Sequence, residues 1–247
     1  MVCSIGIAKV RPDPDGLASR VMGVLVAGGT GALGSAVVRE LLDAGHECTV
    51  TWIVDRERER AEAEFGDRAA FVRADLVDPG RGAADAVAAV DDLEAVVDLV
   101  GGFFSGPLVH ETAWEDFDRM LRLNVAPAFN LARVAMPRML ERGGGSFVAV
   151  SARPALKPFA GASAYVTAKA AVLAFVQALD ADYRTKGIRA NAILPSVIDT
   201  PANRAAEPDA DHSKWVQPGE IATVVRFLVS DDSAVTSGAA IPVYGRA

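Results

Sequence analysis

The sequence predicts an α/β fold, in which a single doubly wound, seven-stranded parallel sheet carries helices on both faces. Three observations predict it. Apolar, β-rich runs alternate with segments of helical periodicity along most of the chain. A glycine-rich turn joins the first apolar run to the first helical segment. The 247 residues are 51% hydrophobic, which is enough for one full core, and no linker-like stretch divides them.

The apolar runs expected to form strands end before helical segments or polar turns. In chain order they are residues 21–27, 47–54, 71–76, 93–100, 147–151, 188–194 and 239–244. In such a sheet the ligand lies at the carboxyl ends of the strands. Residues 1–21 show no periodicity and are predicted to be a flexible extension ahead of a domain that spans 22–247.

Helical periodicity follows the glycine turn and returns in residues 114–141, in 161–185 and in a final segment that ends at Val229. Pro127 and Pro137 are expected to interrupt the second of these helices, because proline removes a backbone hydrogen bond. The polar stretch of about 196–216 follows a strand end, and a loop of that length commonly covers a substrate.

The bulk composition argues against several classes of function. The net charge is -7 and basic residues alternate with acidic ones, so no nucleic-acid surface is expected. Two cysteines without a CxxC pair predict neither a disulfide framework nor a metal site, and favour a cytoplasmic location. No run of about 18 apolar residues occurs, so no membrane span is expected.

The turn at residues 28–34 is the first candidate binding element. It lies between a predicted strand and a predicted helix, where backbone N–H groups can approach a pyrophosphate and the helix dipole favours negative charge. The alternative is that the glycines only close a strand-to-helix connection. The residues expected to contact a dinucleotide here are Gly28, Thr30, Gly31, Ala32, Leu33 and Gly34.

Tyr165 and Lys169 form the candidate catalytic pair. They are four residues apart in a helical segment and therefore share one face of the helix. The Lys169 cation is expected to lower the tyrosine pKa from about 10 towards the working pH, which makes Tyr165 a proton donor. Taken alone this spacing also occurs by chance, and its position after a glycine turn and the apolar strand 147–150 is what favours a catalytic role.

Together these motifs resemble the short-chain dehydrogenase/reductase family, from about Met22 to Tyr244. The resemblance implies a Rossmann-type fold, NAD(P)-dependent oxidoreduction of a small-molecule substrate, and a homodimer or homotetramer. It implies that Lys169 binds the nicotinamide ribose and that Asn124 holds a water linking this lysine to solvent. It also implies cofactor contacts from Tyr165, Asp75, Leu76, Gly101, Pro195 and Val197, with Asp75 at the adenine.

The chain departs from the family at the substrate side. Most members carry a serine 13 residues before the tyrosine, where this chain has Ala152, and an Asn-Asn-Ala-Gly motif where it has Asp98-Leu99-Val100-Gly101. Ser151 and Ser163 are the candidate replacements. Adjacent strand residues point to opposite sides, which argues against Ser151, and Ser163 has local capping as its alternative role. Phe103 and Trp215 are further candidate substrate contacts.

These departures, together with Pro195-Ser196, resemble the dihydropteridine reductase branch of the family. The resemblance implies hydride transfer to a small conjugated acceptor, with quinonoid dihydropterin as the candidate and Tyr165 as the proton donor. A quinonoid ring delocalises the developing charge, so that one donor suffices. The alternatives are a ketone or quinone reductase that uses a replacement serine, and a nucleotide-sensing protein without turnover.

The choice between NAD and NADP depends on the end of the second predicted strand. Trp52 and Ile53 offer neither a carboxylate nor a guanidinium there, whereas Arg56 and Arg58 follow within reach of a 2′-phosphate. Asp55 opposes them, but one bidentate arginine outweighs a more distant repulsion, so the sequence favours NADP. The branch resemblance implies NADH instead, and the arginines alternatively form only a solvated helix face.

Overall fold

The protein, described here by a computed structural model covering residues 21–246, is built on one seven-stranded parallel sheet in the order β3-β2-β1-β4-β5-β6-β7. The strands are β1 Gly23–Ala27, β2 Glu47–Trp52, β3 Ala69–Arg73, β4 Leu93–Asp98, β5 Gly145–Val150, β6 Ile188–Pro195 and β7 Ala240–Val243. The predicted fold class is confirmed. The predicted extension falls on residues outside those described, apart from its last residue, Val21.

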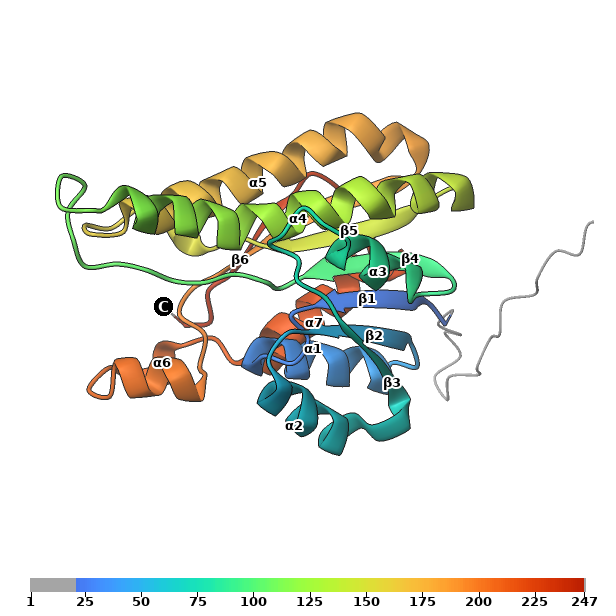
Figure 1. Cartoon of the computed structure of the whole chain (residues 1–247), viewed down its shortest axis with the longest axis horizontal. Coiled ribbons are helices and arrows are strands. Elements are labelled where there is room, and N and C mark those ends of the chain that lie inside the picture. The colour runs from blue at the N-terminus through green and yellow to red at the C-terminus, as the bar shows by residue number, and fades with distance from the viewer. Residues whose placement is uncertain (1–20, 247) are drawn as a thin grey trace, which may run out of the picture.

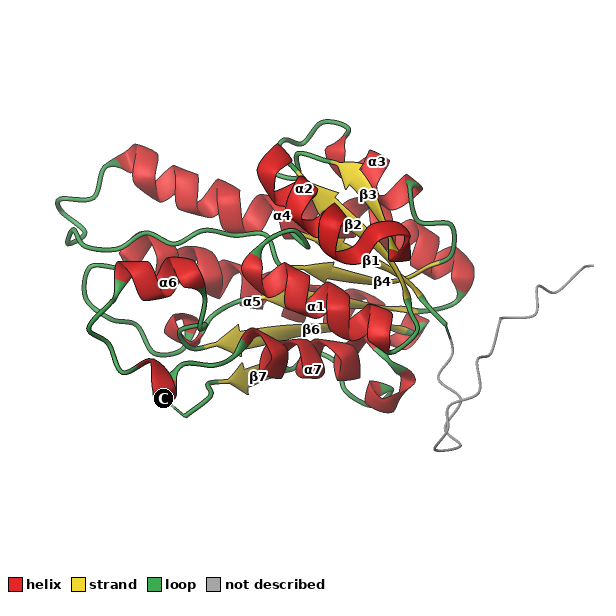
Figure 2. Cartoon of the chain, turned by 90° about the horizontal axis from the view of Figure 1, so that it is seen from below, coloured by secondary structure: helices red, strands yellow, loops and turns green. Residues whose placement is uncertain are grey.

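Helices cover both faces of the sheet (Figure 1). The helices α3 Gly82–Ala88, α4 Trp114–Arg142 and α5 Ser163–Tyr183 share one core with the sheet. The opposite core is formed by α1 Ala32–Asp43, α2 Asp55–Phe65 and α7 Pro218–Val229. Figure 2 shows that the short helix α6, Pro201–Ala206, lies on the side of the sheet where β6 and β7 end, beyond their carboxyl ends.

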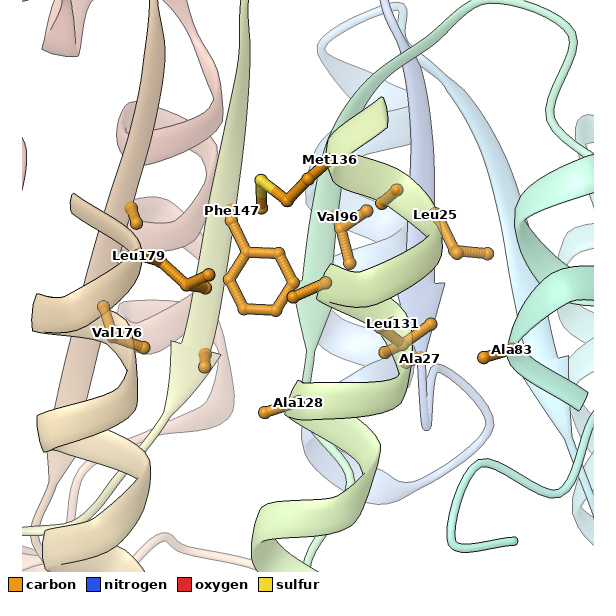
Figure 3. Close-up of a cluster of buried hydrophobic side chains, with 14 of the residues drawn as sticks. Leu25, Ala27, Ala83, Val96, Ala128, Leu131, Met136, Phe147, Val176 and Leu179 are labelled. Carbon is orange, nitrogen blue, oxygen red and sulfur yellow. The ribbon is translucent and has the colours of Figure 1, made fainter. Parts of the chain in front are cut away.

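Strand alternation sorts the core into these two halves, because neighbouring residues of a strand face opposite sides. In β5, Phe147 packs on the α4–α5 side while Val148 packs on the α1–α7 side. Figure 3 shows the Phe147 ring between Leu131 and Met136 of α4 and Val176 of α5. A fully buried side chain of this kind contributes roughly 1.5–3 kcal/mol.

The predicted interruption of the second helix is wrong. Pro127 and Pro137 both lie inside a continuous helix of 29 residues, α4. Each proline removes one N–H from the helix but leaves the rest of the hydrogen-bonding pattern available. Burial of one side of the helix, including Leu131 and Met139, supplies the stabilisation that the two missing hydrogen bonds do not.

The expectation that no segment spans a membrane stays a prediction, and one helix bears on it. Among the described residues, the segment Ser163–Lys186 is long and apolar enough to cross a membrane, with a mean hydropathy of 1.3. Its apolar residues Val172, Val176 and Leu179 are buried against the sheet. Packing in the core of the domain therefore accounts for the composition of this helix.

The predicted polar loop at 196–216 contains ordered structure. Ile198 pairs with Val216 in an isolated bridge, and Asp199 N donates to Val216 O at 2.8 Å. The Thr200 hydroxyl caps α6 by accepting from Asn203 N at 3.2 Å. The loop is therefore closed at its base and carries α6 past the carboxyl ends of the strands.

Candidate active site

The glycine turn forms a tight connection between β1 and α1. Gly28 has a φ of +73°, which favours glycine, and a Cβ added to Gly34 would lie 2.2 Å from Gly28 O. Gly31 begins the helix without a side-chain cap, so the leading N–H groups of α1 are left for another acceptor. These features fit the pyrophosphate of a dinucleotide, which binds at such a helix N-terminus.

The turn lies where the order of the sheet reverses, between β1 and β4. Gly28 N donates to the Thr51 hydroxyl of β2 at 3.0 Å, and a Cβ added to Gly28 would lie 3.3 Å from Val100 Cγ2. The turn is therefore held against the carboxyl ends of β2 and β4. This switch point is where open α/β sheets bind ligands.

Tyr165 lies in the first turn of α5 and is half-buried. The Phe103 ring contacts it edge-on, with 4.9 Å between the ring centroids. Burial raises the pKa of Tyr165 to about 12, which is opposite to the expected direction. The reason is that the Lys169 ammonium donates to Val150 O at 2.9 Å, and burial outweighs any influence of its charge on the phenol.

Lys169 is buried beside the end of β4. A Cβ added to Gly101 would lie 2.9 Å from Lys169 Nζ and 2.6 Å from Asn124 Oδ1, so only glycine leaves room for both polar groups. Burial lowers the pKa of Lys169 to about 8, and the charge of Asp98 opposes this shift. The ammonium is thus held in a confined polar pocket formed by β4, β5 and α4.

Asn124 fastens the loop after β4 to helix α4. Its amide accepts from Gly102 N at 3.2 Å and donates to Gly102 O at 3.2 Å and to Met120 O at 2.9 Å. None of these partners is the Leu123 carbonyl, which Pro127 leaves without its helical N–H donor. The role of Asn124 in holding a water stays a prediction.

The two candidate replacement serines differ in their availability. Ser151 is buried, and its hydroxyl donates to Lys169 O at 2.7 Å, so its single hydrogen is already used. The structure therefore contradicts the prediction that Ser151 is a second donor to the substrate. Ala152, at the family's serine position, is buried and has no hydroxyl, whereas Ser163 is half-buried at the start of α5, two residues before Tyr165.

The remaining predicted cofactor contacts lie at or just beyond strand ends, and their side chains differ in solvent exposure. Asp75 is exposed and its carboxylate accepts from Val77 N at 3.0 Å. Leu76 packs its side chain in the core and its carbonyl accepts from Asn130 Nδ2 at 3.0 Å, which leaves little of it for an adenine. Pro195 is the buried last residue of β6, and Val197, just beyond, is 39% exposed.

Trp215 is not placed as a substrate contact requires. Its ring is 7% exposed and packs against His212, with 4.3 Å between the ring centroids. The adjacent Lys214 carbonyl accepts from Arg246 N at 3.3 Å, so this end of the loop packs on the C-terminal segment. Phe103, in contrast, is 63% exposed and lies on Tyr165.

Helix α2 contacts the glycine turn. The Thr30 hydroxyl donates to Glu57 Oε2 at 3.2 Å, and Arg60 Nη2 donates to Thr30 O at 2.7 Å. Glu57 had not been expected in the site. Ala32 and Leu33 occupy the first turn of α1 as expected, with Leu33 packed partly on the core.

Two guanidinium groups flank the Trp52 ring at the end of β2. Arg58 Cζ lies 5.0 Å from the ring centroid and Arg73 Cζ lies 5.9 Å from it. Arg58 Nη1 also donates to Glu62 Oε2 at 2.9 Å. Arg56 is exposed in the first turn of α2.

The sequence left two carboxylates of this region unassigned, Glu57 and Asp98. Asp98 ends β4 and is buried, and its carboxylate accepts from Val100 N at 3.1 Å. Burial raises the pKa of Asp98 to about 7, opposed by that hydrogen bond and by Lys169. Its signal was present in the sequence, as an acidic residue closing an apolar strand where the family has asparagine. Glu57 had no such signal, because its contact depends on how α2 docks.

Comparison with known proteins agrees with this geometry. The short chain dehydrogenase family model matches residues 23–211. 2-(R)-hydroxypropyl-CoM dehydrogenase of Xanthobacter autotrophicus is 31% identical over 73% of this chain and 78% of its own. A 3-alpha-(or 20-beta)-hydroxysteroid dehydrogenase of Mycobacterium bovis is 27% identical over 93% of this chain and 91% of its own.

Solved structures agree as well. A short chain dehydrogenase/reductase family protein superposes with a TM-score of 0.84 at 29% identity, covering 91% of this chain and 96% of the other. A short-chain type dehydrogenase/reductase from Mycobacterium ulcerans superposes with a TM-score of 0.85 at 25% identity, covering 91% and 89%.

Proposed function

The chain belongs to the short-chain dehydrogenase/reductase family and is an NAD(P)-dependent oxidoreductase, and we propose that it reduces a conjugated carbonyl or quinonoid compound with Tyr165 as the proton donor. One observation carries this proposal. Ala152 lacks a hydroxyl and Ser151 has committed its own, so the family's second donor to the substrate is missing.

The missing donor matters most for a simple ketone. When a ketone is reduced, charge develops on one oxygen, and a preorganised donor there is worth roughly 2.7–4 kcal/mol. A conjugated acceptor spreads this charge over several atoms and depends less on a second donor. The bound nicotinamide supplies the hydride.

The residues of the site divide the remaining work. Tyr165 carries its phenolic proton at neutral pH, as a proton donor must, although burial raises its pKa to about 12 and makes it a weaker acid than the sequence predicted. Phe103 lies against the tyrosine and offers an exposed apolar ring to one side of a planar acceptor. Asn124 fixes the loop that carries Phe103 through its contacts with Gly102.

The acceptor itself is tested by restoring the hydroxyl. Relatives named for hydroxypropyl and hydroxysteroid substrates favour a ketone, whereas the missing donor favours quinonoid dihydropterin or another quinonoid ring. Ala152→Ser is expected to raise reduction of a simple aliphatic ketone about tenfold or more, which is about 1.4 kcal/mol, and to change quinone reduction much less.

Ser163→Ala is the matched control for that experiment. If Ser163 is not a donor, its loss lowers turnover of either acceptor by about tenfold or less. A wild-type enzyme that reduces simple ketones as fast as quinones, and loses this activity in Ser163→Ala, would show that Ser163 replaces the missing donor.

We further propose NADPH as the preferred cofactor. Arg58 and Arg73 place positive charge around Trp52 at the strand end, and Arg56 is exposed nearby. Glu57, bound to Thr30, opposes a 2′-phosphate and favours a ribose hydroxyl instead.

Rates with NADPH and NADH test this preference in wild type and in two variants. Arg56→Ala is expected to weaken NADPH use, and Glu57→Gln to strengthen it, each leaving NADH less affected. A strong NADH preference that Arg56→Ala leaves unchanged would contradict the proposal.

A homodimer or homotetramer through α4 and α5 is the proposed assembly. Val172, Val176 and Leu179 are buried in the core and are not available to a partner. Phe129 of α4 is 49% exposed and packs against the partly exposed Phe175 of α5, with 6.0 Å between the ring centroids. This aromatic pair is the apolar feature that would form the centre of the interface.

A further inference from the structure

Asp98 is a buried carboxylate that the proposed chemistry leaves without a role. It is 3% exposed, and one of its oxygens accepts from Val100 N at 3.1 Å. A single backbone hydrogen bond compensates only partly for removing a carboxylate from water, and buried charges are generally paired. The position therefore calls for a charged partner.

Strand alternation directs Asp98 towards α4 and α5. Val96, two residues earlier in β4, and Ala149, the Cα partner of Asp98 in β5, both belong to the core beneath these helices. Val97, between Val96 and Asp98, packs in the opposite core. Because alternate residues of a strand share a face, the carboxylate lies on the α4–α5 side.

Lys169 approaches the end of β4 from α5. Its ammonium donates to Val150 O, one residue after Ala149 in β5, and lies against Gly101, three residues after Asp98. Burial disfavours the charge of either group, and each charge reduces the shift that burial imposes on the other. The two groups therefore compensate each other's burial.

Within the part of the chain that the structure describes, Lys169 is the side chain whose charge acts on Asp98. The strand partners of Asp98 are Ala27 of β1 and Ala149 of β5, and the neutral amide of Asn124 lies against Gly101, three residues after Asp98. Helix α5 contributes Lys169 and, one turn earlier, Tyr165, which remains protonated at neutral pH.

We propose that Asp98 is a positioning residue that keeps the Lys169 ammonium charged and fixed beside Gly101. The inference rests on the proposed function, in which Lys169 acts beside Tyr165. The asparagine that the family has at this strand end has no charge and cannot offset the burial of the lysine. In this chain the alkaline limit of activity is therefore set by the pair of groups.

Asp98→Asn tests the inference through the pH profile of turnover. Without the carboxylate, the buried lysine loses its proton at lower pH. The descending alkaline limb is expected to move down by about one pH unit or more, which is the usual effect of a lost opposite charge. The proposal would be overturned if the alkaline limb of the Asp98→Asn profile stayed where it is in wild type, or if turnover fell by the same factor at every pH.

Glu94→Gln is the matched control. Glu94 is also a buried carboxylate of β4, but it lies at the other end of the strand, where it pairs with Arg142. Its replacement removes one buried negative charge without touching Lys169, so the alkaline limb is expected to stay where it is. A limb that moves equally in both variants would show a general effect of charge and overturn the proposal.

Unfolding in urea gives a readout that needs no substrate. Because the folded pKa of Asp98 lies above its unfolded value, the wild type loses stability as pH rises from about 4 to about 7. Asp98→Asn lacks this loss, so its urea midpoint is expected to rise relative to wild type between about pH 5 and about pH 7. A difference between the two midpoints that is independent of pH would show that the folded protein does not penalise the charge of Asp98, and would remove the burial cost on which the proposal depends.

The two readouts separate the two proposals. If wild type shows no cofactor-dependent turnover with any acceptor, the proposed function fails, while the urea midpoints still test whether Asp98 carries a buried charge that needs a partner. Asp98→Ser, whose hydroxyl oxygen can still accept from Val100 N, is used in the same measurements if Asp98→Asn does not fold.

Discussion

At the scale of single residues, the site is defined by which hydrogen atoms remain available. The Tyr165 hydroxyl has its proton at neutral pH, as an ordinary phenol does, and burial raises its pKa further, to about 12. The Ser151 hydroxyl has given its hydrogen to Lys169 O, and Ala152 has none to give. With neither of these positions supplying a second donor, the site favours acceptors that spread their charge over a conjugated system.

Replacement of Tyr165 by Phe is expected to lower turnover by about a hundredfold or more, which is typical for removal of a general acid. Cofactor binding, measured by calorimetry, is expected to persist, since the glycine turn and Lys169 are untouched. Unchanged turnover in Tyr165→Phe would remove Tyr165 from the mechanism. Absence of turnover already in wild type, with cofactor still bound, would support the nucleotide-sensing alternative.

At the scale of elements, the glycine turn and helix α4 show how packing sets what a segment can tolerate. A Cβ added to Gly34 would overlap the backbone of Gly28, whereas a Cβ added to Gly31 would make an ordinary contact, 3.5 Å from Gly28 O. Helix α4 tolerates two prolines because its buried side is extensively packed. In both cases the packing of neighbouring segments decides how much stability a given residue type costs at that position.

Gly34→Ala is expected to lower both the free energy of unfolding and the affinity for the dinucleotide, since its methyl group would overlap Gly28 O. Gly31→Ala is the matched control, because its φ of -71° suits alanine and its methyl group has space in the fold. We expect Gly31→Ala to keep its stability and to lose affinity only. Urea unfolding and calorimetry distinguish the two, and equal stability of both variants would contradict the geometry of the turn.

Pro137→Ala is expected to raise the free energy of unfolding by about 1–3 kcal/mol, because it restores an N–H in an exposed part of a helix. Pro127→Ala should gain less, since Pro127 is buried and its replacement leaves a cavity. Urea unfolding measures both. A larger gain at Pro127 than at Pro137 would show that packing is not the deciding factor.

At the scale of the whole molecule, the two helical layers have different surfaces. The α4–α5 layer exposes the aromatic pair of Phe129 and Phe175, whereas α7 on the opposite layer exposes Phe227. The proposed assembly uses the first of these surfaces. Exposed aromatic residues typically mark the core of an interface when they form a cluster.

Phe129→Glu is expected to convert the proposed oligomer into smaller species, because a carboxylate at the centre of an apolar interface loses its hydration. Light scattering during size-exclusion chromatography measures the mass. Phe227→Glu, a similarly exposed position on α7, is expected to leave the mass unchanged. A monomeric wild type, or equal loss of mass in both variants, would contradict an interface at α4 and α5.

Much of the fold and part of the site followed from the sequence, because these features are local. The period of two or 3.6 residues predicts strands and helices, a glycine turn predicts the strand-to-helix connection, and the spacing of Tyr165 and Lys169 predicts a common helix face. The predicted strand ends ran up to three residues too far. The overrun is three residues at β3 and two at β2, where the turn that precedes α2 is also apolar.

The tertiary structure alone decided how the polar groups of the site are paired. The Ser151 hydroxyl donates to the α5 backbone, and the Thr30 hydroxyl donates to Glu57. The Lys169 ammonium donates to Val150 O and is influenced by the charge of Asp98. None of these pairings has a sequence period, because each depends on which strands are neighbours and on how a helix docks on them. The pKa values follow the same contacts and burial, which is why the tyrosine shifted opposite to the direction that the spacing of Tyr165 and Lys169 had predicted.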